Sequence, residues 1–435
     1  MQFDRFIGAL RERNFRLYFI GQMTSATGTG MTIVALAFAV LAGHRSASAL
    51  GAVFAAETLP LALFLLVGGV AADRLGRRFV MIGSDALRSA AMGAMAAWVL
   101  IGRPPLWGFL LLSALVGTGT AFFVPSSTGL IPAVVSQENL SQANAMVGLT
   151  FSIGGMLGPA LAGVVVATTS PGWAMLADAV TYVVSFGSML MMRLGAQEAS
   201  PAGESFFHQL RTGWREFRSR TWLWVIVAQW AIGNVAIMAP FMVLGAVVAK
   251  QSLGGASAWG TILACQGIGA IVGGLVMLRL KPRRPLVVAT ASAFVFPLSM
   301  VALGLRAPLA LIAASAGLMG LSMAVFAVLW DTTMQREVPP EVLSRVSSYD
   351  WFGSLVFLPL GYAVIGPVSA AIGVRGTFLL SAGYAAGSSV LVLCVPAVRH
   401  MRWRDSPVEV KAAGDAEVAD RLAASASASA PLAAD

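Results

Sequence analysis

The stretch GVAADRLGRR at residues 69–78 decides the fold class of this chain. It joins two long apolar runs, at about 49–72 and 79–101, through a turn that is short and strongly basic. Such a turn is typical of two membrane-spanning helices that meet on the cytoplasmic side, where arginines are retained. The residues that we expect to act there are Gly69, Asp73, Arg74, Gly76, Arg77 and Arg78.

The composition extends this membrane assignment to the whole chain. Of the 435 residues, 57% are apolar and 11% are charged, and the mean hydropathy is +0.78. These values are typical of a polytopic membrane protein. The net charge of +9 would favour nucleic-acid binding if the basic residues gathered on one soluble face. They fall instead in alternate loops, so we expect the lipid bilayer as a partner and no nucleic acid.

Twelve apolar runs are long enough to cross the ~30 Å hydrocarbon core of a bilayer as helices. Strands of a membrane barrel would span only about ten residues each, so the sequence predicts an all-α membrane protein. The runs lie at about 17–42, 49–72, 79–101, 106–131, 142–168, 172–194, 222–249, 256–280, 286–305, 308–331, 346–371 and 374–398.

The distribution of basic residues predicts the orientation. Twenty-three lysines and arginines fall at the termini or in even-numbered loops, against five in odd-numbered loops. By the positive-inside rule both termini are cytoplasmic, and we expect a multi-pass protein of the plasma (inner) membrane. The first apolar run is too long for a cleavable signal peptide, so it is predicted to remain as the first span.

The chain is predicted to consist of two six-helix halves. Residues 125–163 align with residues 328–366 at a constant offset of 203, and the identical positions include Val135, Glu138, Leu140, Ser141, Gly158 and Gly163. A parallel repeat of this kind is found in several transporter folds. The expected regions are a cytoplasmic N-terminus (1–16), an N-terminal half (17–194), a cytoplasmic linker with an amphipathic helix (195–221), a C-terminal half (222–398) and a disordered cytoplasmic tail (399–435).

The sequence carries no pattern of an enzyme or of a nucleotide-driven pump. It contains no GxxxxGK[ST] loop, and its two cysteines, Cys265 and Cys394, and three histidines lack metal-ligand spacing. We therefore expect no enzymatic activity, no cofactor and no metal site.

Two motifs resemble those of the major facilitator superfamily of transporters. A glycine four residues ahead of Asp-Arg-x-Gly-Arg-Arg, as in 69–78, resembles the superfamily signature between spans two and three. The fifth span carries a stretch that resembles the antiporter motif of drug exporters, with Gly154, Gly158, Pro159 and Gly163. Over about residues 8–398 the chain is similar to the branch of macrolide-efflux and enterobactin-export proteins.

The resemblance implies a secondary active transporter that exports hydrophobic drugs or siderophore-like small molecules by alternating access. Protons are the expected coupling partner and a monomer the expected state. Ser113 stands where many proton-coupled exporters carry an arginine, so coupling to protons would require a different arrangement. A lipid or lysophospholipid flippase, or a membrane sensor or scaffold without transport, are the alternatives.

Charged residues inside spans are costly and therefore mark candidate functional sites. Glu57 in the second span and Asp178 in the sixth are the candidates for a coupling carboxyl. The alternative for both is a structural hydrogen bond between helices. The expected gate residues are Asp85 and Arg88, spaced to pair with each other or with the motif loop, and Asp331 and Asp350.

The resemblance also implies that spans one, four, seven and ten line a central cavity. Aromatic side chains with a few amides and hydroxyls suit a large amphipathic ligand, although each of them has packing as its alternative role. The expected lining residues are Tyr18, Gln22, Ser25, Thr118, Phe122, Ser126, Trp230, Asn234 and Trp330.

Overall fold

The computed structural model describes residues 8–44, 46–102, 104–193, 206–280 and 282–403. Every regular element in these ranges is a helix, as expected where a bilayer offers no water to bond the backbone. Ten stretches of the described residues are long and apolar enough to cross a membrane, and one of them, Arg345–Cys394, has 50 residues. That stretch breaks at Gly373, where φ is 76°, and therefore accounts for two spans.

A further helix, α5, completes the set of twelve spans in the described ranges. Its 25 residues are enough to cross the bilayer, but Asp85 and Arg88 lower its hydropathy. The all-α fold with twelve membrane-crossing helices is thus confirmed. The first six spans are α3 (Arg13–His44), α4 (Ala47–Leu75), α5 (Arg77–Ile101), α6 (Leu106–Val134), α7 (Leu140–Thr168) and α8 (Pro171–Met191).

The later spans are less regular. The seventh starts as α10 (Thr221–Gly233) and continues through three π-helical segments, η2 (Asn234–Met238), η3 (Pro240–Leu244) and η4 (Ala249–Leu253), with α11 (Gly245–Val248) between the last two. The eighth span is α12 (Ala256–Met277), the ninth is α13 (Pro285–Ser292) with η5 (Ala293–Val295) and α14 (Phe296–Gly304), and the tenth is α15 (Leu309–Glu337). The eleventh span is α16 (Pro340–Leu355) with the part of α17 (Leu358–Cys394) before Gly373, and the twelfth is the rest of α17. Shorter helices are α2 (Gly8–Arg11), η1 (Gln137–Asn139), α9 (Phe206–Ser219) and α18 (Pro396–Arg399).

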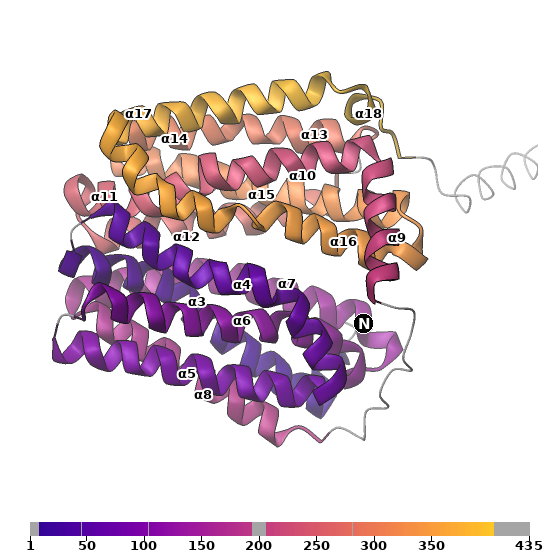
Figure 1. The fold of residues 1–435 in the computed structure, drawn as a ribbon, viewed down its shortest axis with the longest axis horizontal. Coiled ribbons are helices and arrows are strands. Elements are labelled where there is room, and N and C mark those ends of the chain that lie inside the picture. The colour runs from indigo at the N-terminus through magenta and orange to yellow at the C-terminus, as the bar shows by residue number, and fades with distance from the viewer. Residues whose placement is uncertain (1–7, 45, 103, 194–205, 281, 404–435) are drawn as a thin grey trace, which may run out of the picture.

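The spans form two bundles that lie side by side (Figure 1). We call α3 to α8 the first bundle and α10 to α17 the second bundle. The described N-terminus, α9 and α18 lie at one end of the molecule, the terminal end. The opposite end, where α3 passes into α4 and η4 into α12, is called the far end.

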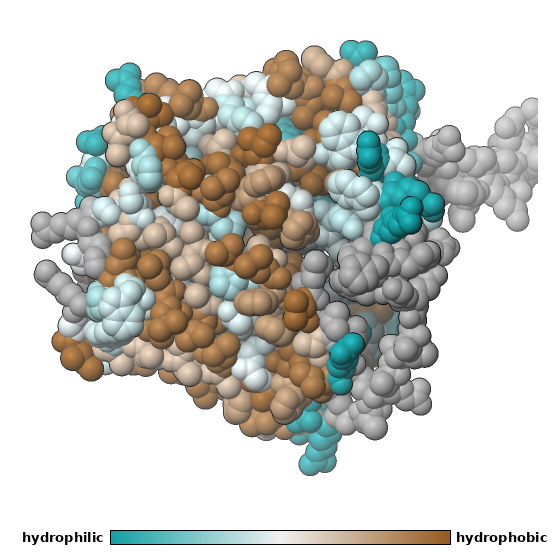
Figure 2. All heavy atoms as spheres, in the orientation of Figure 1, coloured by the Kyte–Doolittle hydropathy of each residue, from teal (hydrophilic) through white to brown (hydrophobic). Residues whose placement is uncertain are grey.

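The outer surface is that of a membrane protein. Figure 2 shows apolar side chains across the middle of the molecule and hydrophilic ones gathered at its two ends. Large apolar side chains such as Leu63, Val164 and Leu380 are more than 45% exposed. A surface of this extent would aggregate in water but matches lipid tails, so the spans face the bilayer with their apolar sides.

The amphipathic linker helix is present as α9, which runs across the terminal end (Figure 1). Trp214 and Phe217 pack on Tyr349 of α16, with ring centroids 5.6 and 6.0 Å apart. Arg211, Arg215 and Arg218 are exposed, whereas the side chains of Phe206 and Leu210 lie outside the described part. The helix thus covers the start of the eleventh span and presents its basic face outward.

A carboxylate fixes the described N-terminus to the first bundle. Glu12 accepts hydrogen bonds from the backbone and hydroxyl of Ser136 and from the amide of Asn139, at 2.8–3.0 Å. Partial burial raises the pKa of Glu12, but these hydrogen bonds together outweigh it, so the pKa lies below its ordinary value of 4.5. The N-terminal segment is therefore held by a charged group.

The two bundles touch along two helix pairs near the far end. A β-carbon at Gly260 of α12 would lie 2.4 Å from the Pro159 carbonyl oxygen of α7, so only glycine fits there. A β-carbon at Gly51 of α4 would lie 2.2 Å from the Tyr362 carbonyl oxygen of α17. Lys250 adds a hydrogen bond across the far end, from its Nζ to the Leu41 carbonyl oxygen.

Toward the terminal end, α4 and the α16–α17 segment separate. Free space of about 350 Å³ lies there between α4 and the α16–α17 segment, part of it open to solvent. Its walls are Thr58, Leu61, Ala62 and Leu65 on one side and Trp351, Phe352, Leu355 and Leu358 on the other. We call this space, together with the contact above it, the seam; it is closed at the far end and opens toward the terminal end.

Candidate functional site

The basic turn 69–78 joins α4 to α5 at the terminal end. Gly76 adopts φ of 89°, a conformation that favours glycine. Arg77 Nη1 donates to the Gly129 carbonyl oxygen of α6, and Arg78 donates to the Met189 and Leu190 carbonyl oxygens at 2.8 and 2.9 Å, at the end of α8. Both arginines thus stabilise the negative ends of helices. Arg74 is exposed, and the side chain of Asp73 lies outside the described part.

The close helix approach expected at Gly69 occurs one residue earlier. A β-carbon at Gly68 would lie 2.4 Å from the Ala121 carbonyl oxygen of α6, whereas at Gly69 the nearest atom, Pro125 Cβ, is 3.9 Å away. The sequence motif identifies the helical turn of α4 where the close approach occurs, but Gly68 rather than Gly69 faces α6.

Asp85 and Arg88 form an ion pair inside the first bundle. Their exposed fractions are 0% and 5%, and the guanidinium lies 4.0 Å from the Phe123 ring centroid and 4.4 Å from that of Tyr182. Cation–π contacts on both sides offset part of the cost of burying the charge. The pair therefore joins α5 to α6 and α8.

Asp178 is fully buried and already bonded. Thr32 Oγ1 donates to its Oδ2 at 2.6 Å, and Thr181 Oγ1 lies 3.2 Å from its Oδ1. The neighbouring Tyr182 hydroxyl bonds Thr29 at 3.1 Å. These contacts tie α8 to α3 and leave Asp178 no access to the seam.

Glu57 has a different environment. It lies on α4, half-buried, between the far-end contact of Gly51 and the open part of the seam. No described residue forms a hydrogen bond with its carboxylate, but it lies within electrostatic range of Asp178 and Tyr182 of the first bundle and of Tyr362 of the second. Its own carbonyl oxygen meets Gly117, where a β-carbon would lie only 1.8 Å away. The α4 backbone is thus fixed against α6 beside a carboxylate that lies between the two bundles.

The two acids at the terminal end of the second bundle, Asp350 and Asp331, also differ in their contacts. Trp330 Nε1 donates to Asp350 Oδ2 at 3.0 Å, which joins α15 to α16. Asp331 is exposed. Only Asp350 is thus held in a contact between two spans.

The expected cavity residues of the first bundle turn mostly inward. Tyr18, Gln22, Ser25 and Ser126 are buried, and Tyr18 packs in a cluster with Met81 and Phe123. Thr118 donates to the Ala114 carbonyl oxygen at 2.8 Å. Phe122 is half-buried and stacks on Phe64 with centroids 6.4 Å apart. In this conformation these side chains serve packing more than ligand contact.

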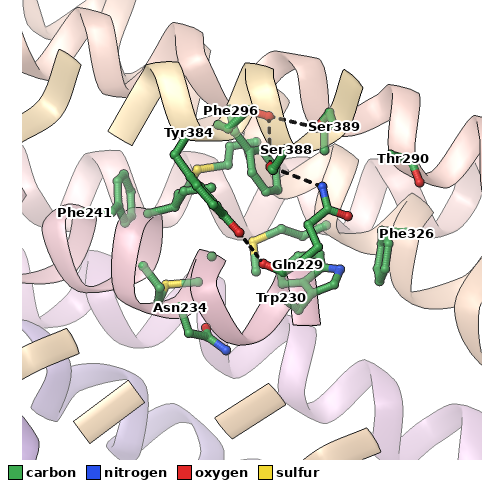
Figure 3. Close-up of a pocket in the computed structure, with 17 residues that line it drawn as sticks. Gln229, Trp230, Asn234, Phe241, Thr290, Phe296, Phe326, Tyr384, Ser388 and Ser389 are labelled. Atoms are coloured by element: carbon green, nitrogen blue, oxygen red, sulfur yellow. Dashed lines mark hydrogen bonds between the residues drawn. The ribbon is translucent and has the colours of Figure 1, made fainter. Parts of the chain in front are cut away.

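Trp230 and Asn234, by contrast, line a pocket inside the second bundle (Figure 3). Its free space is about 600 Å³, part of it open to the surroundings, within the range of small-molecule sites. Trp330 is not part of it but stacks on the lining residue Phe326 at 5.9 Å. The polar lining residues that the sequence did not single out are Gln229, Thr290, Tyr384, Ser388 and Ser389.

The antiporter-like stretch lies on α7 and packs on both sides. A β-carbon at Gly158 would lie 2.6 Å from the Gly30 Cα of α3, and one at Gly154 would lie 2.7 Å from the Ala26 carbonyl carbon. Pro159 and Gly163 meet Gly260 of the second bundle. The helix remains continuous through Pro159. The stretch thus connects the first span to the contact between the bundles.

Comparison with known proteins agrees with this architecture. The chain is 27% identical to the multidrug efflux pump Tap of Mycolicibacterium fortuitum over 415 residues, covering 89% of this chain and 96% of that protein. It is 25% identical to the enterobactin exporter EntS of Escherichia coli O6:K15:H31 (strain 536 / UPEC) over 416 residues, covering 92% and 95%.

Solved structures share the fold at lower sequence identity. A crystal structure of the nucleoside transporter NupG matches with a TM-score of 0.72 at 12% identity, covering 87% of this chain and 99% of the other. A bacterial homologue of the human lysosomal transporter Spinster, inward-facing and unoccupied, matches with a TM-score of 0.70 at 15% identity, covering 92% and 99%.

The family model described as transmembrane secretion effector matches residues 6–421, nearly the whole chain. The motif at the turn of α4 and α5, the twelve spans in two bundles and this match lead to one conclusion. The protein belongs to the transmembrane secretion effector family of major facilitator superfamily transporters.

Proposed function

We propose that this protein exports hydrophobic drugs or siderophore-like small molecules across the inner membrane, driven by the proton gradient. The observation that carries the proposal is the seam, closed at the far end by Gly51, Gly260 and Lys250 and open toward the terminal end. With the terminal end in the cytoplasm, as the basic residues indicate, the seam receives substrate from inside. The names of the relatives Tap and EntS support both substrate classes.

Glu57 is the group that we assign to proton coupling. A coupling carboxyl must exchange its proton with water as the bundles rock, so it has to reach the path. Glu57 is half-buried at the seam and without a hydrogen-bond partner among the described residues, whereas Asp178 is enclosed by Thr32 and Thr181. Asp178 therefore serves to hold α3 and α8 of the first bundle together, and Glu57 is the acid that can exchange a proton with water.

Alternating access would exchange the present contact between the bundles at the far end for a contact at the terminal end. Glycine contacts at the far end allow α7 and α12 to lie backbone to backbone, and at the α4–α17 contact the rings of Phe54 and Tyr362 pack beside Gly51. Such surfaces can part with little loss of packing. Closure of the terminal end would bring α4 against Trp351 and Phe352, both well exposed at present.

The proposal is tested by accumulation measurements in cells with and without the protein. The panel contains neutral and cationic fluorescent drugs and a catecholate iron chelator, with and without a protonophore. We expect lower accumulation of at least one of these compounds in cells that carry the protein, and loss of the difference when the proton gradient is collapsed. Equal accumulation across the panel would contradict export, and a difference that survives the protonophore would contradict proton coupling.

A further inference from the structure

The pocket of Figure 3 is separate from the seam. All of its lining residues belong to the second bundle, from α10 with η2 and η3, from α13 to α15, and from α17. No described lining residue comes from the first bundle or from the walls of the seam, so substrate in the seam does not occupy this space. The pocket lies instead inside the second bundle, between the seventh span, α13 to α14, α15 and α17.

The pocket reaches toward the lipid-facing surface at α17. Its lining residues Tyr384 and Ser388 are half-exposed, and the adjacent Gly383 and Gly387 are exposed with nothing within 4 Å of a β-carbon. These glycines share a helical stripe with Leu380 and Leu391, whose exposed fractions are 64% and 71%. Molecules dissolved among the lipid tails thus meet Tyr384 and Ser388 beside an uncrowded stripe of α17.

The lining selects for an uncharged molecule. Its described residues include no Asp, Glu, Lys, Arg or His, so a charged ligand would lose its hydration without a partner among them. Its apolar walls are mainly rings and thioethers, which adapt to varied shapes. The residues that form them are Trp230, Met238, Phe241, Phe296, Met319, Met323 and Phe326.

Of the two buried hydroxyls in the described lining, Ser389 donates to the Ala385 carbonyl oxygen, whereas Thr290 is unbonded. Thr290 is 1% exposed, and its Oγ1 has no hydrogen-bond partner among the described residues. A threonine on a helix ordinarily bonds the carbonyl one turn earlier, so an unbonded buried hydroxyl is costly. Nearby, the Gln229 amide reaches Ser388 only at 3.3 Å (Figure 3).

We propose that this pocket is a second ligand site, which takes an uncharged amphipathic molecule from the bilayer and bonds its polar group through Thr290. The apolar body of the ligand lies among the rings and thioethers, and its hydroxyl or carbonyl reaches the Thr290 hydroxyl. Because the site is enclosed by four spans of one bundle, its occupant stiffens the second bundle while leaving the seam free.

The test uses the purified full-length protein in liposomes that contain a monoacylglycerol with a diazirine in its acyl chain. After illumination, labelled peptides are mapped by mass spectrometry. We expect labels on residues 230–241 and 319–326, which an excess of unlabelled monoacylglycerol removes and the corresponding fatty acid does not. Labels confined to Thr58–Leu65 and Trp351–Leu358, or equal competition by the fatty acid, would overturn the proposal.

Two variants examine the site itself. Ala385→Phe fills the pocket, and we expect labelling to fall by about tenfold, while the neighbouring Ala386→Phe retains it. Thr290→Val keeps the side-chain shape, so the fold is preserved; it should raise the melting temperature without ligand and reduce labelling several-fold. Thr290→Ser, which keeps the hydroxyl, should label like the wild type. Unchanged labelling in both Ala385→Phe and Thr290→Val would show that the molecule binds elsewhere, whether or not the protein exports drugs.

Discussion

At the scale of single residues, the contacts of each intramembrane acid decide what it can do. Asp85 is paired with Arg88, and Asp178 accepts bonds from two threonine hydroxyls. Asp350 is bonded by Trp330. Glu57 differs from these three because the residue is half-buried beside the seam and no described residue forms a hydrogen bond with its carboxylate. An acid in that position can change its protonation state without breaking a helix contact.

Replacement of Glu57 by Gln should therefore remove proton coupling. We expect the acceleration of transport by an imposed pH gradient in proteoliposomes to fall by about tenfold or more, because an amide cannot carry a proton. Substrate binding should persist. Asp178→Asn, the matched control, should keep its response to the gradient, and the reverse pattern in the two variants would assign the coupling role to Asp178.

Glu12 makes the attachment of the N-terminal segment sensitive to acid. Its pKa is lower in the folded protein than in the unfolded chain, so its contribution to stability is present above pH 4.5 and is lost as the pH falls through the folded value. Glu12→Gln should cost about 0.5 kcal/mol at pH 7, since the group is largely solvated, and less at pH 3. Hydrogen exchange of residues 8–16 at both pH values measures this, and an equal effect of the substitution at pH 3 and pH 7 would contradict it.

At the scale of helices, glycine contacts determine which spans can slide. The α7–α12 contact depends on Gly260 meeting Pro159 and Gly163, with a β-carbon at Gly260 only 2.9 Å from the Gly163 Cα. Side chains there would hold the bundles apart. Elsewhere on α12, a β-carbon at Gly274 meets nothing within 4 Å. The two glycines therefore give a test and its control on one helix.

We expect Gly260→Val to destabilise the protein by about 1–3 kcal/mol through overpacking and to slow transport, because the far end no longer closes. Gly274→Val should leave both close to wild type. Thermal unfolding in detergent and transport in proteoliposomes measure the two effects. Similar losses in both variants would mean that valine harms α12 generally rather than the contact between bundles.

The sequence predicts helices far better than it predicts the faces that they turn to one another. The spans, the turn at Gly76 and the i,i+3 pair Asp85–Arg88 depend on local composition and spacing, so they could be recognised. Tyr18 and Gln22 share a helical face, but no local signal tells whether it meets the seam or the bundle interior. The Tyr384 hydroxyl bonds the Gln229 carbonyl oxygen at 2.7 Å across 155 positions, a contact that only the tertiary structure reveals.

At the scale of the whole molecule, the contacts at the far end decide whether that end of the transporter is closed or open. Lys250 Nζ reaches the Leu41 carbonyl oxygen near the end of α3, where a cation also meets the negative end of a helix. It adds a polar contact to the glycine contacts and the Phe54–Tyr362 ring pair that hold the two bundles together there. Loss of this donor should favour the conformation in which the far end is open.

We expect Lys250→Met to increase the population of that conformation about fivefold, the equivalent of one hydrogen bond of about 1 kcal/mol. Spin labels at Thr169 and Arg306, both exposed at the far end, report the distance between bundles after Cys265 and Cys394 have been replaced. The distribution should shift to longer distances in Lys250→Met and not in Lys250→Arg. An unchanged distribution in Lys250→Met would show that the lysine does not contribute to closure.

The π-helical segments of the seventh span also bear on how such chains change in length. Each π turn accommodates one residue more than an α turn, so η2, η3 and η4 together hold surplus residues within a continuous 33-residue span. Loss of one codon in η2 would convert it to an α turn, and because the surplus residue is then gone, the residues that follow keep their orientation. Phe241 would therefore stay in the pocket, and the span would still cross the bilayer. Single deletions here would change the lining within η2 alone without unfolding the protein, a route to divergence that point substitutions do not provide.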